Sequence, residues 1–150
     1  MRAAFVFFVS LFMAMPAVGQ KPENVGEAGE WQLLIRIDTF TGKKFCYLSN
    51  ETDMAGMIHV SSVQRDIMAN NGQVLSKRSE YRIDDGEFTR VRETYEHHSV
   101  IIDDASQLLG AKTIEIIFDV WHGDPDPQIF DLSGIEDAWD WLTGPECAGD

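Results

Sequence analysis

The segment from Trp121 to Pro127 comes nearest to a metal-ligand pattern in this sequence. His122, Asp124 and Asp126 stand at alternate positions in a loop stiffened by two prolines. Oxygen ligands at alternate positions are typical of calcium-binding loops, but no glycine follows at the required place and no glutamate closes the pattern. A solvated turn is therefore the favoured interpretation, and a metal site at these three residues is the alternative hypothesis.

His97 and His98 form a second candidate, beside Glu93 and Glu96. Imidazole and carboxylate groups suit zinc or copper, but adjacent residues on a strand point to opposite faces, so both histidines can bind one ion only if they lie in a loop. An exposed strand end is the favoured interpretation. If either histidine reached the 122–126 loop, the combined groups would suit a metal-dependent hydrolase.

Nucleophilic and acid–base catalysis have less support. The sequence contains no Gly-x-Ser-x-Gly elbow, and Cys46 lies in a predicted strand with a ready disulfide partner. The carboxylate pairs at 84–85 and 103–104 fit a hairpin turn and a helix cap. We therefore expect no catalytic residue and no cofactor.

The tryptophans are candidates for contacting a partner. Trp31 and Trp139 fall in the apolar phase of a strand and a helix, which predicts core positions. Trp121 borders the acidic loop and Trp141 flanks the inward face of the helix, so both would form an aromatic patch if exposed, although peripheral packing is the favoured alternative. The candidate partner-binding residues are Trp121, Asp124, Asp126 and Trp141.

The net charge restricts the possible partners. The 150 residues include 25 acidic and 12 basic side chains, for a formal charge of -13. Such a chain repels the phosphate backbone of nucleic acids and gains nothing at an anionic membrane surface. We expect a protein or a cell-envelope component as the partner, with no nucleic acid.

The first nineteen residues have the three parts of a secretory signal peptide. Arg2 precedes an apolar run from Ala3 to Met15, and the small-residue site Ala17-Val18-Gly19 follows. The run is shorter than the roughly 20 residues that span a bilayer. We expect cleavage near Gly19, no membrane insertion afterwards, and a soluble product that is periplasmic or secreted. In that oxidising setting, Cys46 and Cys147, the only cysteines, predict one disulfide.

The remaining chain predicts one β-rich domain over residues 31–150, after a polar and flexible lead-in over 20–30. Alternating apolar residues and turn signals predict strands near 31–37, 45–48, 57–63, 81–83, 88–92, 99–102, 112–120 and 128–132. The Asp-Asp-Gly-Glu turn at 84–87 predicts a hairpin with glycine at positive φ. Two prolines in the 121–127 loop predict that no strand pairs through it.

Two helices complete the prediction. A short helix near 104–110 would be capped by Asp104 and ended by Gly110. A C-terminal helix near 134–143 would begin with a capping box, in which Ser133 and Glu136 bond each other's backbone amides. The fold class is therefore mainly β: an antiparallel β-sandwich or a curled barrel with a helix packed on it.

Several segments, taken in their order along the chain, resemble those of a known protein family. They are the Trp-led first strand, the early strand with Cys46 and Leu48, the segment 101–113, and the closing run from Phe130 to Ala138. Their order resembles small periplasmic proteins of the invasion-associated locus B type and related all-β periplasmic domains, mainly over residues 100–147. The resemblance implies a secreted β-rich fold with a host- or envelope-facing role and names no catalytic residue.

Two functions from different classes follow as expectations. The first is an exported, non-catalytic domain that binds a protein or envelope component through a sheet edge or its acidic loop surface. The alternative is a small metal-binding protein or metal-dependent hydrolase that uses His122, Asp124 and Asp126 with His97 or His98.

Overall fold

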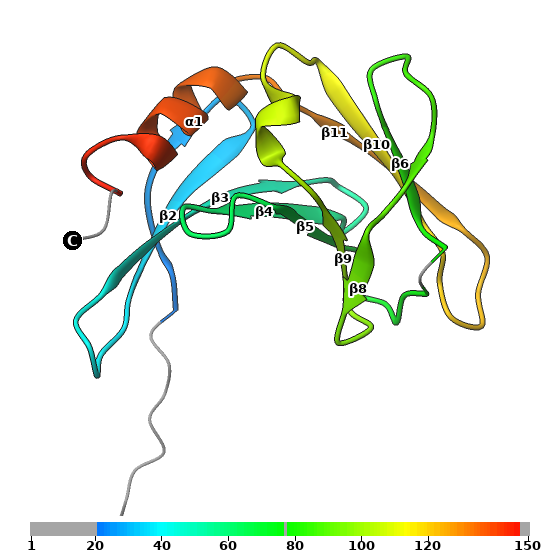
Figure 1. Cartoon of the computed structure of the whole chain (residues 1–150), viewed down its shortest axis with the longest axis horizontal. Coiled ribbons are helices and arrows are strands. Elements are labelled where there is room, and N and C mark those ends of the chain that lie inside the picture. Colours follow the sequence, from blue (N-terminus) through cyan, green and yellow to red (C-terminus); the bar gives the residue numbers. More distant parts are fainter. Residues whose placement is uncertain (1–20, 77, 148–150) are drawn as a thin grey trace, which may run out of the picture.

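Two antiparallel sheets face each other in the computed structural model, which describes residues 21–76 and 78–147 (Figure 1). The expected signal peptide, residues 1–19, lies outside the described residues. The larger sheet has the order β1 (Glu23–Ala28), β2 (Trp31–Ile37), β3 (Lys44–Glu51), β4 (Met57–Ser61), β5 (Ile67–Asn70), β9 (Ser99–Ile102) and β8 (Glu93–Tyr95). The smaller sheet has the order β11 (Asp126–Asp131), β10 (Thr113–Phe118), β6 (Glu80–Ile83) and β7 (Thr89–Arg90).

The core lies between the sheets and is built from one phase of each strand. Side chains of β3, β4, β5 and β9 meet Ile114, Ile116 and Phe118 of β10, all three of which are fully buried. This alternation is the period-2 signal that the sequence displayed. The sandwich prediction is confirmed, and the barrel alternative is wrong because the two described sheets stay separate and end in the open edges β1, β8, β11 and β7.

Both predicted helices are present. Asp104 caps a 3-10 helix, η1 (Ala105–Leu108), by accepting a hydrogen bond from the Ser106 backbone amide. The C-terminal helix α1 (Ile135–Thr143) packs on β1, β2 and β3 and buries Ile135, Ala138 and Leu142.

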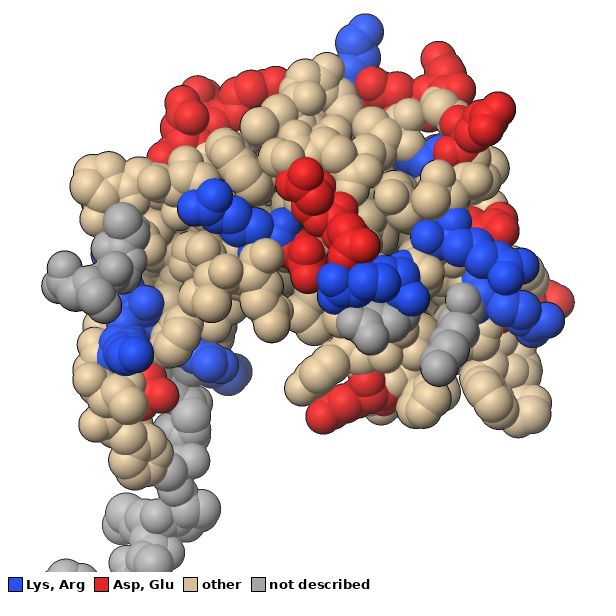
Figure 2. Space-filling view, in the orientation of Figure 1, with Lys and Arg blue, Asp and Glu red and all other residues tan. Residues whose placement is uncertain are grey.

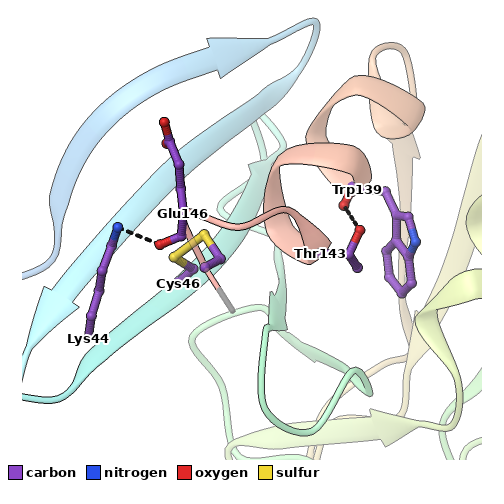
Figure 3. Close-up of a disulfide and its surroundings, with 6 residues drawn as sticks. Lys44, Cys46, Trp139, Thr143 and Glu146 are labelled. Carbon is purple, nitrogen blue, oxygen red and sulfur yellow. Dashed lines mark hydrogen bonds between the residues drawn. A yellow bond between two sulfur atoms is a disulfide. The ribbon is translucent and has the colours of Figure 1, made fainter. Parts of the chain in front are cut away.

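The predicted disulfide joins Cys46 of β3 to Cys147, just beyond α1, with 5.6 Å between the Cα atoms (Figure 3). Beside it, the Lys44 ammonium donates to the backbone carbonyl of Glu146 at 2.6 Å. The segment that follows α1 is therefore fixed to the start of β3 by a covalent bond and a charged hydrogen bond.

The prediction of a capping box at the start of α1 is wrong. The N-cap of α1 is Gly134, which makes no side-chain cap bond. The Ser133 hydroxyl donates to Asp131 instead, and Glu136 accepts from the amide of Gly110, 26 residues away. A local bond to Asp131, two residues earlier, and a long-range bond from Gly110 have replaced the capping box.

The prediction of a flexible lead-in over residues 20–30 is also wrong for most of that segment. Residues 23–28 form β1, which pairs with β2 along the edge of the larger sheet. The turn after β1 meets the start of α1 so closely that a Cβ on Gly29 would lie 2.1 Å from the carbonyl oxygen of Ser133. A Cβ on Gly134 would likewise lie 2.2 Å from the carbonyl oxygen of Ala28, and both glycines have positive φ.

Two turn predictions need correction. In the 84–87 hairpin the residue at positive φ is Asp84, at 49°, and Gly86 is not among the residues with positive φ. The Asp84 carboxylate accepts from the amides of Lys112 and Thr113, which fixes the turn against β10 and lowers the Asp84 pKa. Pro127 lies inside β11, opposite Ile117, because β11 is an edge strand whose free side needs no amide donor.

Candidate functional site

The loop between β10 and β11 does not gather its predicted metal ligands. Asp126 belongs to β11, and its carboxylate accepts hydrogen bonds from the side-chain amides of Asn71, at 2.8 Å, and Gln128. Asp124 is exposed, and His122 accepts a 2.6 Å hydrogen bond from the indole of Trp121. The oxygens of Asp126 thus bond Gln128 of the same strand and Asn71, which follows β5 of the other sheet.

His97 and His98 lie in the turn between β8 and β9, where His97 has a φ of 59°. The His97 ring is 6.5 Å from the Trp121 ring, which in turn lies 5.7 Å from the His122 ring. The structure therefore brings the two predicted segments together around Trp121. In residues 21–76 and 78–147, however, no three His, Cys, Asp or Glu side chains are grouped so that they could hold a metal ion.

The two candidate tryptophans do not form one patch. Trp121 is 54% exposed, whereas Trp141 is half-buried against the core, as is Trp139. In Figure 1, α1 and the loop between β10 and β11 lie at opposite ends of the molecule. Trp31 is fully buried, as predicted.

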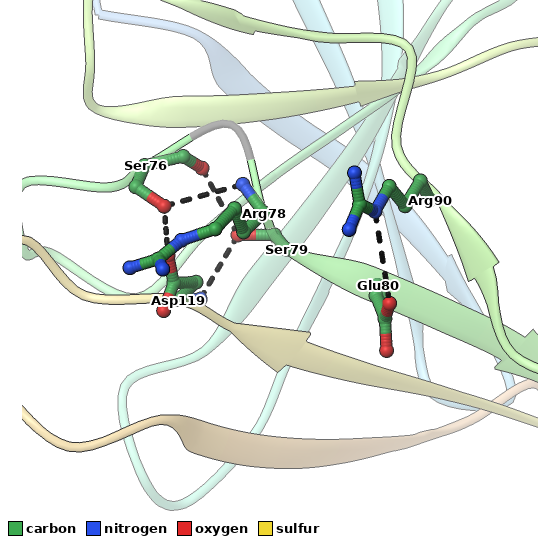
Figure 4. Close-up of polar contacts among 6 residues, drawn as sticks. All are labelled: Ser76, Arg78, Ser79, Glu80, Arg90 and Asp119. Carbon is green, nitrogen blue, oxygen red and sulfur yellow. Dashed lines mark hydrogen bonds and ion pairs between the residues drawn. The ribbon is translucent and has the colours of Figure 1, made fainter.

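A polar cluster supports the Trp121 loop from the side of the smaller sheet (Figure 4). The Asp119 carboxylate accepts from the Ser76 hydroxyl and, at 3.1 Å, from Arg78. The amide of Asp119 donates to the Ser79 hydroxyl at 2.9 Å. Since these contacts join the segment before β6 to the end of β10, the cluster is a structural link between two parts of the chain.

An apolar concavity lies on the larger sheet, on the face turned away from the core. It has a volume of about 430 Å³, within the range of small-molecule sites. Its lining is mainly apolar and comes from five neighbouring strands. We call it the outer groove, and its lining includes Leu34, Arg36, Phe45, Tyr47, His59 and Met68.

Strand register explains why these side chains share a face. Leu34 of β2 lies opposite Tyr47 of β3, and Arg36 lies opposite Phe45. His59 of β4 in turn lies opposite Met68 of β5. These residues occupy the phase opposite to the core phase of the same strands. The surface in Figure 2 is hollowed below the larger sheet, between the β2–β3 hairpin on the left and the loops on the right.

Charge is unevenly placed along the outer groove. The Arg36 guanidinium lies 5.8 Å from the centre of the Phe45 ring and 5.9 Å from that of Tyr47, and no carboxylate forms a salt bridge with it in the described part of the chain. Asp66, also in the lining, is paired with Arg92 at 3.3 Å. The groove therefore offers a ligand one guanidinium that forms no salt bridge in the described residues, and one carboxylate that is already paired with an arginine. The pKa of Asp38, lowered mainly by hydrogen bonds from the amides of Thr41 and Phe40, is lowered further by the charge of Arg36.

His59 adds a titratable group to the outer groove. Its burial among the neighbouring strands lowers its pKa, and the charge of Glu51 opposes that shift. The imidazole is therefore held neutral to lower pH than an exposed histidine. The apolar character of the groove floor is thus maintained at neutral pH.

The outer groove was not among the sites predicted from the sequence, although its residues leave a signal there. Leu34, Phe45 and Tyr47 occupy the phase that a solvated sheet face would fill with polar residues. A strand that is apolar in both phases indicates a sheet covered on both faces or a binding surface. Here the second face is covered by no other element of the described chain.

Comparisons with known protein families, with curated proteins and with solved structures gave no match. Within the described residues, no helix has the length and hydropathy required to cross a membrane. The fold and the site define a class of small disulfide-linked β-sandwiches that carry an apolar groove on an outer sheet face.

Proposed function

We propose that this protein is an exported, non-catalytic domain that binds an apolar part of a cell-envelope component or protein through the outer groove. The observation that carries the proposal is the groove itself: an apolar concavity of about 430 Å³ on a sheet face where a monomer without a ligand would place solvated residues. The signal-like N-terminus, the disulfide and the resemblance to invasion-associated locus B proteins support a periplasmic or secreted location.

Fluorescence of a neutral apolar dye, N-phenyl-1-naphthylamine, tests the proposal on the chain that begins at Gln20. Wild-type protein should enhance the dye's emission saturably. Met68→Asp, which places a charge on the groove floor, should abolish the enhancement. Ile129→Asp is the matched control, since Ile129 is 63% exposed on β11 and lies outside the groove. Absence of saturable enhancement by the wild type, or equal enhancement by both variants, would overturn the proposal.

The exposed patch around Trp121 supports a second candidate surface for a partner. Trp121 lies between two histidines, and both His97 and His122 have positive φ, a strained conformation that clusters at functional sites. Partner capture by chemical crosslinking in intact cells should be lost with Trp121→Ala and retained with Met68→Asp if this patch is the binding surface. The reverse result assigns the partner to the outer groove.

A metal-binding protein or metal-dependent hydrolase that uses His122, Asp124 and Asp126 is the alternative function. The observation that favours it is that His97 and His122 line the same cavity beside Trp121. Elemental analysis of protein purified without chelator tests it. A molar ratio near one metal per chain that falls on His122→Ala supports the alternative, and a ratio near zero ends it.

A further inference from the structure

The ligand of the outer groove is constrained by the one unpaired cation in its lining. Arg36 stands in the midst of apolar side chains, stacked on Phe45 and Tyr47, and forms no salt bridge within the described residues. A guanidinium presents several N–H donors in a plane, a geometry that matches a carboxylate. The end of the groove at Arg36 is therefore suited to an anionic group.

The one carboxylate in the lining, Asp66, is already paired with Arg92, a cation that Asp103 shares. Between these groups the floor consists mainly of Leu34, Phe45, Tyr47 and Met68, which gain from contact with an apolar chain. The groove thus has an apolar body, a cationic end at Arg36 and a carboxylate that is already paired with Arg92.

The charge of the whole protein adds a further constraint. At -13, the chain repels small anions over long range. A short carboxylate such as acetate would gain too little from Arg36 alone to overcome this repulsion. An anionic ligand must therefore bring an apolar chain long enough to fill the groove.

We infer that the outer groove binds a single-chain amphiphile with a carboxylate head, its acyl chain lying along the groove and its carboxylate bonded to the Arg36 guanidinium. This inference rests on the proposed function, because it names the chemical class of ligand for the same groove. A free fatty acid is the experimental probe, since it carries both the carboxylate for Arg36 and the acyl chain that supplies the affinity.

Displacement of N-phenyl-1-naphthylamine by laurate, below its micellar concentration, tests the inference on the wild-type chain beginning at Gln20. Laurate should displace the dye at lower concentration than the uncharged 1-dodecanol. Along the series octanoate, decanoate and laurate, affinity should rise by about two- to fourfold for each added methylene. Dodecyltrimethylammonium should bind more weakly than laurate, because its cationic head meets Arg36.

Arg36→Gln should weaken laurate binding about fivefold and leave 1-dodecanol binding unchanged. Arg36→Lys should retain part of the preference for laurate, which distinguishes loss of charge from loss of packing. Arg90→Gln is the matched control, since Arg90 is an exposed arginine on β7 outside the groove. Far-UV circular dichroism and thiol titration establish that each variant is folded and disulfide-bonded.

The outcomes separate the two proposals. If wild-type protein binds the dye and 1-dodecanol but shows no preference for laurate, or if Arg36→Gln leaves the preference intact, the carboxylate inference is overturned and the groove function stands. Displacement by an apolar peptide but by no amphiphile also overturns the inference. If the wild type binds neither dye nor amphiphile, the proposed function fails as well.

Discussion

Removal of the Cys46–Cys147 disulfide should lower the free energy of unfolding by about 4 to 5 kcal/mol. The two residues are 101 positions apart, so the bond closes a loop that contains most of the strands and α1. In the chain-entropy description, a closed loop of about 100 residues destabilises the unfolded state by about 4.7 kcal/mol. The Cα separation of 5.6 Å is in the ordinary range for disulfides, so no backbone movement is needed to form the bond.

Urea unfolding of the Cys46→Ala/Cys147→Ala double variant measures this contribution. With a denaturant slope of about 1.5 kcal/mol per molar, the midpoint should fall by about 3 M relative to the oxidised wild type. Reduced wild-type protein should behave like the variant, and reductant should leave the variant unchanged. A loss below about 1 kcal/mol, with the wild-type bond verified by thiol titration, would refute the loop-entropy reasoning.

Two further predictions concern backbone packing and pH. Gly29→Ala and Gly134→Ala should each lower the free energy of unfolding by about 2 to 4 kcal/mol, since the new Cβ would overlap a facing backbone carbonyl; Gly42→Ala, at positive φ in open space, should cost only about 1 kcal/mol. Equal losses in thermal or urea unfolding would show that φ alone matters. Because burial holds the folded-state pKa of His59 below 6.5, the unfolded chain takes up this proton first as the pH falls. Stability should therefore decline below about pH 6.5, and His59→Gln should reduce the slope of unfolding free energy against pH; an unchanged slope in the variant contradicts the assignment.

Elements with strong periodicity were predictable from the sequence because their burial is set by their own side chains. The strand near 112–120 and the helix near 134–143 are the clearest cases, observed as β10 and α1. The disulfide was predictable because only two cysteines exist. In each case a local pattern or a simple count is sufficient.

Elements whose stability comes from a neighbour were missed. β1 is polar and exposed, and its strand conformation depends on backbone pairing with β2. Ser133 and Glu136 have the spacing of a capping box, but Ser133 bonds Asp131 two residues earlier, and Glu136 bonds the amide of Gly110 from a distant segment. Local spacing does not reveal this competition, because it depends on the tertiary arrangement.

The candidate sites also combine features that the sequence predicts with features that depend on the fold. The proximity of the Trp121 loop to His97 required the fold, since 24 residues separate Trp121 from His97 in the chain. The outer groove left a visible trace in the two apolar phases of β2 and β3, but its curvature and the unpaired state of Arg36 depend on how the strands are arranged in space.

The position of the disulfide also sets an order for biogenesis. Cys46 follows β2 and lies near the start of β3, whereas Cys147 comes after α1, so oxidation must wait until every described strand and helix has been synthesised. With two cysteines, only one intramolecular pairing exists and no isomerase is required to correct it. The reduced chain must therefore bring two thiols that are 101 positions apart into contact before the bond can form, and the bond then joins the start of β3 to the segment after α1.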